Sequence, residues 1–240
     1  MVPVTYWVVA GMGISPAIAI RIAFGTSLLV MLPTAISGTW EHNKKKAIRW
    51  KTALILGSCG LAGALAGSTL AAHLPGRILE AGFGGLVLAV ALWMGLGIMP
   101  KLVGEAKEPR DDSLRLAACG FPIGMVAGLT GLGGGLLIVP ALVLAFNFPM
   151  HVAIGTSVAS IIFTSLGGSV GYVINGLGVP GLLPHSIGYV NLIIWLCLAA
   201  TSIPLARVGS RTAHALPAKQ LRYVFIAFMV YAGLRMIGVF

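Results

Sequence analysis

Long apolar stretches separated by short polar loops dominate this chain. They cover residues 1–12, 17–38, 50–72, 78–99, 116–146, 152–174, 186–206 and 220–237. Runs of about 20 apolar residues are long enough to cross the hydrocarbon core of a bilayer as helices. The strict alternation of apolar and polar residues that membrane-spanning strands require is absent. The pattern therefore predicts an all-α integral membrane protein with seven to eight transmembrane or re-entrant helices.

The apolar pattern divides into two halves at residues 100–115, where four bases and four acids lie close together. A short element occurs once in each half: residues 23–27 read Ala-Phe-Gly-Thr-Ser and residues 153–157 read Ala-Ile-Gly-Thr-Ser. We refer to residues 25–27 and 155–157 as the Gly-Thr-Ser elements. Internal repeats of membrane proteins often place a binding site where the copies meet. We expect a first transmembrane repeat at 1–99, a polar connecting loop at 100–115 and a second repeat at 116–240.

The charges of the loops indicate that the two halves have opposite orientations. Five bases and one acid lie between Glu41 and Lys51, whereas the matching loop of the second half, residues 175–185, has no Lys or Arg. Conversely, four bases lie within residues 207–222, and the matching first-half loop around His73 and Arg77 is weakly charged. Basic loops tend to remain cytoplasmic. The exchanged bias predicts an inverted repeat, with a cytoplasmic loop at 41–51.

The apolar segment 116–146 is too long for one upright crossing. Its 31 residues would span about 46 Å as a straight helix, against a hydrocarbon core of about 30 Å. Its centre reads Gly131-Leu132-Gly133-Gly134-Gly135, which we call the glycine break. Two half-helices folded as a re-entrant hairpin would fit this length, and they would also provide the change of crossing parity that an inverted repeat needs. One long tilted helix is the alternative.

The glycine break is also a candidate anion site. Unwound backbone at membrane depth is tolerated where it is buried in protein or lines a cavity. The helix that resumes after Gly135 would direct its N-terminal amides and the positive end of its dipole at the bound group. Close packing of helices through small residues is the alternative explanation. Gly57, Gly60, Gly63 and Gly67, spaced three and four residues apart, are assigned to such packing.

Composition supports a membrane location and limits the chemistry. The chain is 58% hydrophobic and 9% charged, and its mean hydropathy is +0.97. The net charge is +10, and the basic residues lie mainly in loops between the apolar segments. This placement is better explained by a role in orienting the protein in the membrane than by nucleic-acid binding. The N-terminus does not resemble a removable signal peptide. Three isolated cysteines indicate neither a disulfide nor a metal site, and no cofactor is expected. The expected partners are a small anionic substrate and the lipid bilayer, and a homo-oligomer is compatible with the sequence.

The acids and the hydroxyl groups point to an anionic or neutral substrate. Of the six acids, only Glu80 falls within an apolar segment, whereas cation pathways usually carry Asp or Glu. The sequence contains no recognisable enzyme motif, so no enzyme is expected. Hydroxyls of the Gly-Thr-Ser elements could donate to an oxyanion, although Ser and Thr in membrane helices often bond to their own helix. Arg21 lies four residues before Gly25 and could attract an anion or extend to the interface.

The candidate substrate-binding residues follow from these arguments. They come from the glycine break, from both Gly-Thr-Ser elements and from the intramembrane base: Gly131, Gly133, Gly134, Gly135, Gly155, Thr156, Ser157, Gly25, Thr26, Ser27 and Arg21.

Several motifs in fixed order make the chain similar to a known family. The glycine break is followed by Val139-Pro140, by the second Gly-Thr-Ser element, by Gly168 and Tyr172, and by Gly188-Tyr189-Val190. The first half matches from Val2-Pro3 through the first Gly-Thr-Ser element, and Ala-His-Leu-Pro at 72–75 has a counterpart at 213–217. This combination resembles the sulfite exporter (TauE/SafE) family. Family members also have a glycine-rich stretch before the first Val-Pro; here Met1 comes too late to include it, so either the true start lies upstream or the first half lacks its glycine break.

The resemblance implies a permease in the cell membrane. It implies a secondary transporter that moves sulfite or an organosulfur anion by alternating access, with the glycine and Gly-Thr-Ser elements forming the site. A passive anion channel and a non-transporting membrane scaffold subunit are the alternatives.

Overall fold

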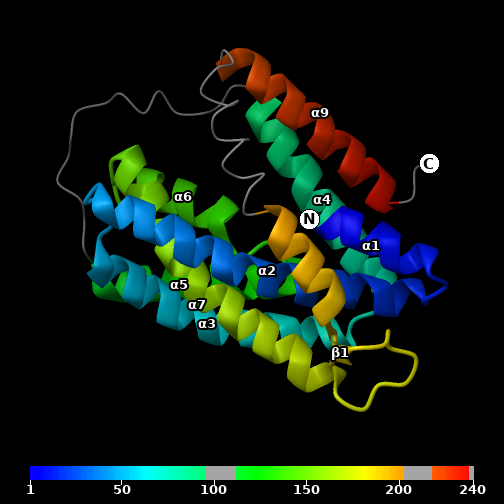
Figure 1. The fold of residues 1–240 in the computed structure, drawn as a ribbon. Helices are drawn as coiled ribbons and strands as arrows, with labels where there is room; N and C mark the ends of the chain where they lie inside the picture. Colours follow the sequence, from blue (N-terminus) through cyan, green and yellow to red (C-terminus); the bar gives the residue numbers. More distant parts are fainter. Residues whose placement is uncertain (96–111, 203–217, 238–240) are drawn as a thin grey trace.

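The computed structural model describes residues 1–95, 112–202 and 218–237, and within these ranges the chain is almost entirely helical (Figure 1). One short antiparallel strand pair, β1 (Ser186–Ile187) with β2 (Val190–Asn191), interrupts the helices. The helices are α1 (Val2–Gly11), α2 (Pro16–Lys44), α3 (Trp50–His73), α4 (Gly76–Gly95), α5 (Ser113–Thr130), α6 (Gly135–Leu144), α7 (Met150–Gly176), an unlabelled helix Leu192–Ser202, and α9 (Ala218–Ile237).

Five of the described helices are long and apolar enough to cross a membrane: α2, α3, α4, α5 and α7. This confirms the all-α membrane class. Helix α2 continues to Lys44, so Glu41 lies in its last turns and not in a loop as the hydropathy pattern predicted. Most of the expected connecting loop at 100–115, and the basic residues Arg207 and Arg211, lie outside the described residues.

Helices α2 and α7 form a central antiparallel pair, and Figure 1 shows them running alongside each other. Near the start of α2, Gly25 lies against Tyr172 at the end of α7. Further along, Leu28 contacts Gly168 and Gly38 contacts Val158. The numbers rise on one helix as they fall on the other, so α2 and α7 run in opposite directions.

Glycines allow α3 to pack closely against two neighbours. A Cβ at Gly57 would overlap Phe163 of α7, and a Cβ at Gly63 or Gly67 would overlap backbone of α5. Small residues at this spacing let helix backbones approach closely in lipid. The packing role predicted for these glycines is confirmed.

Helices α5 and α6 form a hairpin that turns at the glycine break. Helix α5 runs parallel to α3, because Gly120 lies beside Leu56 and Gly128 lies beside Ala64. The C-terminal half of α6 returns to the beginning of α5, since Leu142 shares a buried cluster with Leu116. The prediction of two helices meeting at the break is confirmed, and the alternative of one long tilted helix is wrong.

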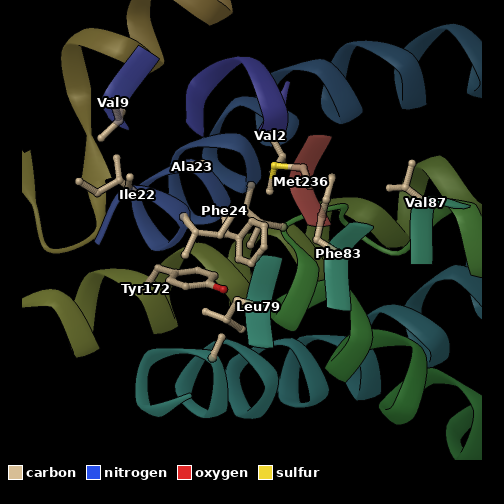
Figure 2. Packing of buried hydrophobic residues seen from close by; sticks show 14 of the residues in the cluster. Val2, Val9, Ile22, Ala23, Phe24, Leu79, Phe83, Val87, Tyr172 and Met236 are labelled. Carbon is tan, nitrogen blue, oxygen red and sulfur yellow. The ribbon is translucent and has the colours of Figure 1, made fainter. Parts of the chain in front are cut away.

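A buried aromatic cluster joins α2 to α4 and α7. The ring of Phe24 lies 5.8 Å from Phe83 and 6.4 Å from Tyr172, measured between centroids. Figure 2 shows Phe24 at the centre, with Val2 of α1 and Met236 of α9 above it. Helices α4 and α9, which lie side by side in Figure 1, contact the central pair through this cluster.

Candidate functional site

The glycine break has a backbone that other residues adopt with difficulty. Gly131 and Gly133 both have φ of 68°, and Gly134 has φ of 81°, all in the left-handed region. Gly134 is the N-cap of α6 and has no side chain to bond the first amides of that helix. A left-handed conformation costs an L-residue about 1–2 kcal/mol, so glycine is needed here for the backbone itself.

The break is buried against the central pair. A Cβ at Gly131 would lie 2.8 Å from the Cα of Phe24, and one at Gly133 would lie 2.7 Å from the sulfur of Met31. Gly135 faces Ile161. On the opposite side, a hollow of about 10 Å³ adjoins Gly134, which leaves room for about one water molecule. The break is therefore closed in this conformation.

A larger apolar hollow lies next to the break. It measures about 240 Å³ and lies between α4 and α5, lined by residues that include Phe83, Leu129 and Thr130. Leu86, Val126 and Thr130 line both this hollow and the small one beside Gly134. The lining is almost wholly apolar, so this hollow supplies space beside the break and few polar partners.

Two kinds of hydrogen-bond donor lie at the break. The intrahelical bonds of α6 begin with the amides of Leu137 and Ile138, which donate to the carbonyl oxygen of Gly134, so the amides of Gly135 and Leu136 come before the first of these bonds. The hydroxyl of Ser165, on α7, is completely buried and has no partner among the described residues. Its Oγ would lie 3.3 Å from a Cβ at Gly133, so it faces the break. Buried polar groups without partners are uncommon in proteins and call for an explanation.

Two other residues of the same helix fix the hairpin in position. The Thr164 hydroxyl donates to the carbonyl oxygen of Gly133 over 2.8 Å, and the Tyr172 hydroxyl donates to that of Gly128 over 2.9 Å. Thr164 and Ser165 were not among the sequence candidates. A signal for them exists, because Thr156, Ser160 and Thr164 repeat every four residues along one face of α7, and Ser165 and Ser169 are spaced in the same way on another.

The two Gly-Thr-Ser elements lie on either side of the break along the central pair. Gly133 contacts Met31 and Ile161, each five residues beyond the threonine of its own element. The Thr26 hydroxyl is engaged by the backbone N–H of Asn191, and the Thr156 hydroxyl by that of Arg49, both over 3.1 Å. The recorded contacts of the break with α2 and α7 are therefore with residues outside the two elements, and the threonine hydroxyls bond elsewhere.

The serines of these elements differ from each other. Ser157 bonds back to the carbonyl oxygen of Ile154 over 2.8 Å, as serines in membrane helices often do. Ser27 is buried, and its hydroxyl has no partner among the described residues.

Arg21 caps the end of α3. Its guanidinium donates to the carbonyl oxygen of Leu74 over 2.8 Å and to that of Ala71 over 3.4 Å. It also lies 5.7 Å from the centre of the Tyr189 ring. A cation is favourable at a helix C-terminus, which explains this placement without a ligand. Arg21 has no recorded contact with the break.

Glu80, the acid predicted to lie within a helix, is in the second turn of α4. Its carboxylate accepts a hydrogen bond of 3.0 Å from the hydroxyl of Tyr6 on α1. Among the described contacts of the glycine break there is no carboxylate.

The apolar helices, the hairpin and the buried donors are features of a multi-pass helical protein of the cell membrane. The chain belongs to the sulfite exporter TauE/SafE family, whose model matches residues 1–236. A comparison with solved structures finds no match.

Several similar proteins are described as probable membrane transporters. A probable membrane transporter of Methanocaldococcus jannaschii is 30% identical over 220 residues, which is 91% of this chain and 79% of that protein. A probable membrane transporter of Bacillus subtilis, YunE, is 32% identical over 65% of this chain and 63% of its own. One of Haemophilus influenzae is 26% identical over 98% and 88%. The chain is therefore a membrane transporter.

Proposed function

We propose that this protein is a secondary transporter of a small anion, sulfite or an organosulfur anion, that binds at the glycine break. The observation that carries this proposal is the coincidence of the first amides of α6, at Gly135 and Leu136, with the buried hydroxyl of Ser165, which has no partner among the described residues. An oxyanion accepts several hydrogen bonds at once, so it is the kind of ligand that would satisfy these donors.

The electrostatics of the break also favour an anion. The N-terminus of α6 carries the positive end of its helix dipole, and the left-handed glycines Gly133 and Gly134 directly precede it. The absence of a carboxylate among the described neighbours of the break disfavours a cation. The name of the family suggests sulfite as a substrate, which fits a small site with amide and hydroxyl donors.

Transport would proceed by alternating access between two inverted repeats. Helices α1 and α6 are both short, and each precedes a long helix that carries a Gly-Thr-Ser element. The long helices, α2 and α7, are antiparallel, as an inverted repeat requires. With the break between them, a movement of one repeat against the other would expose the anion first to one side of the membrane and then to the other.

Flux measurements in proteoliposomes test this function. Purified protein should move sulfite, or one anion of a panel containing thiosulfate, sulfate and small sulfonates, at a rate that saturates and responds to an imposed ion gradient. A passive anion channel would instead give electrical conductance without coupling. Flux at the level of protein-free liposomes for every anion in the panel would contradict the proposal and favour a scaffold subunit.

A further inference from the structure

Each Gly-Thr-Ser element makes the same contact with the opposite half of the chain. Thr26, in the first half, accepts a hydrogen bond from the backbone N–H of Asn191 over 3.1 Å. Thr156, in the second half, accepts one from the backbone N–H of Arg49 over 3.1 Å. The partners are 165 and 107 residues distant in the sequence, so both contacts join the two halves.

The two backbone partners occupy equivalent positions. Arg49 is the N-cap of α3. Asn191 immediately precedes the helix Leu192–Ser202, and its side-chain oxygen accepts from the N–H of Ile194 over 2.9 Å, as an N-cap does. Each threonine therefore accepts a hydrogen bond from the N-cap residue of a helix in the other half of the chain.

The glycine of each element packs closely against the residue two positions before the backbone partner of the threonine. A Cβ at Gly25 would lie 2.7 Å from the carbonyl oxygen of Tyr189, and a Cβ at Gly155 would overlap that of Ala47. Tyr189 and Ala47 lie two residues before Asn191 and Arg49. Glycine and threonine thus act together: the first gives space for the incoming backbone, and the second accepts its hydrogen bond.

The two contacts lie toward opposite ends of the central pair. Gly155 lies beside His42, which is 16 residues beyond Thr26 on α2. At 1.5 Å per residue the separation is roughly 20 Å, with the glycine break between them. The Thr156 contact lies beside the basic segment Lys44 to Lys46, on the face predicted to be cytoplasmic, and the Thr26 contact lies toward the other face.

We propose that Thr26 and Thr156 are two latches, one toward each face of the membrane, that close the paths to the glycine break and open alternately during transport. Both latches are closed in this structure, and the break between them is buried. Movement of one repeat against the other must break a hydrogen bond between the repeats, and these two are equivalent by position. This inference rests on the proposed alternating access but does not depend on which anion is carried. Thr26 and Thr156 are positioning residues that do not touch the substrate.

The latches can be tested by labelling a reporter cysteine from each side separately. Ile161, which contacts Gly133 and Gly135, is replaced by cysteine after Cys59, Cys119 and Cys197 have been changed to alanine. A membrane-impermeant maleimide is then applied to vesicles of either orientation. Thr26→Val should raise the labelling rate from the Thr26 face, and Thr156→Val should raise it from the opposite face. The expected increase is roughly three- to tenfold, the population shift for loss of one hydrogen bond.

Conservative and matched variants separate a latch from a general loss of packing. Thr26→Ser and Thr156→Ser keep the acceptor and should label as the unmodified reporter does. Thr34→Val removes a hydroxyl of α2 that bonds only to the carbonyls of Val30 and Met31, and it should also leave labelling unchanged. Should a valine variant fail to fold, the alanine variant of the same threonine replaces it.

The possible outcomes are distinct. Labelling that rises equally from both faces, that does not rise, or that rises as much with serine as with valine would overturn the latch assignment. Because labelling needs no substrate, side-specific labelling without sulfite flux would support the latches while contradicting the proposed substrate. Sulfite flux without side-specific labelling would support the proposed substrate and contradict the latches.

Discussion

Replacing Gly134 by alanine should lower anion flux roughly 5- to 30-fold per folded molecule. Gly134 has φ of 81°, and an L-residue in this region costs about 1–2 kcal/mol. Alanine would relieve that cost by moving the backbone, and its Cβ would also lie 3.3 Å from the Cβ of Ala127. Either shift changes the direction of the first amides of α6, Gly135 and Leu136. Flux should be measured in proteoliposomes and normalised to monodisperse protein.

The matched control for this change is Gly13→Ala. Gly13 has φ of 82°, and a Cβ there meets nothing within 4 Å, so the backbone strain is the same without the site. The control should lose a similar amount of stability in a thermal melt and keep its flux per folded molecule. Equal losses of flux in both variants would show that backbone strain alone is responsible and would remove the glycine break from the binding site.

Replacing Ser165 by alanine should weaken anion binding about tenfold or more without lowering thermal stability. A hydrogen bond to a charged group contributes about 1.5–3 kcal/mol. The buried Ser165 hydroxyl has no partner in the part of the chain that the structure describes, so its removal costs no hydrogen bond there and relieves an unfavourable burial. The dissociation constant for sulfite, measured by calorimetry, and the melting temperature without anion are the two quantities to compare.

Ser160→Ala provides the opposite control. The Ser160 hydroxyl is also buried in α7, but it donates to the carbonyl oxygens of Thr156, over 3.0 Å, and Ala53, over 3.3 Å. Its removal should lower the melting temperature, because hydrogen bonding within the fold is lost. The dissociation constant for sulfite should change by no more than about twofold, because this hydroxyl does not face the break. Unchanged anion binding in Ser165→Ala would contradict the assignment of this hydroxyl to the site.

The membrane class and the hairpin could be predicted from sequence because both depend on local properties. Segment length and apolar content decide whether a helix can cross a bilayer. The excess length of residues 116–146, with glycines at its centre, allowed few arrangements, and the hairpin of α5 and α6 is one of them. The exact ends of helices were harder to predict. Helix α2 continues through polar residues to Lys44, beyond the end of its apolar pattern.

The partners of individual polar side chains could not be predicted because they are distant in sequence. Thr26 finds its donor 165 residues away, and Arg21 finds its acceptors at the end of α3 only after α2 and α3 have packed. A serine within a helix usually bonds to its own backbone, so nothing local distinguishes Ser165, which lacks a partner, from Ser157, which has one. The repeat of Gly-Thr-Ser indicated an important element, but its contacts between the halves required the fold.

Anomalous diffraction from crystals grown with selenite, a heavier analogue of sulfite, tests the binding site most directly. The account predicts a selenium peak within hydrogen-bonding distance of the Ser165 hydroxyl and of amides in residues 132–136. The same peak should be absent from crystals of Ser165→Ala at equal selenite concentration. A peak beside the Arg21 guanidinium, with none at the glycine break, in a protein that carries sulfite would contradict it.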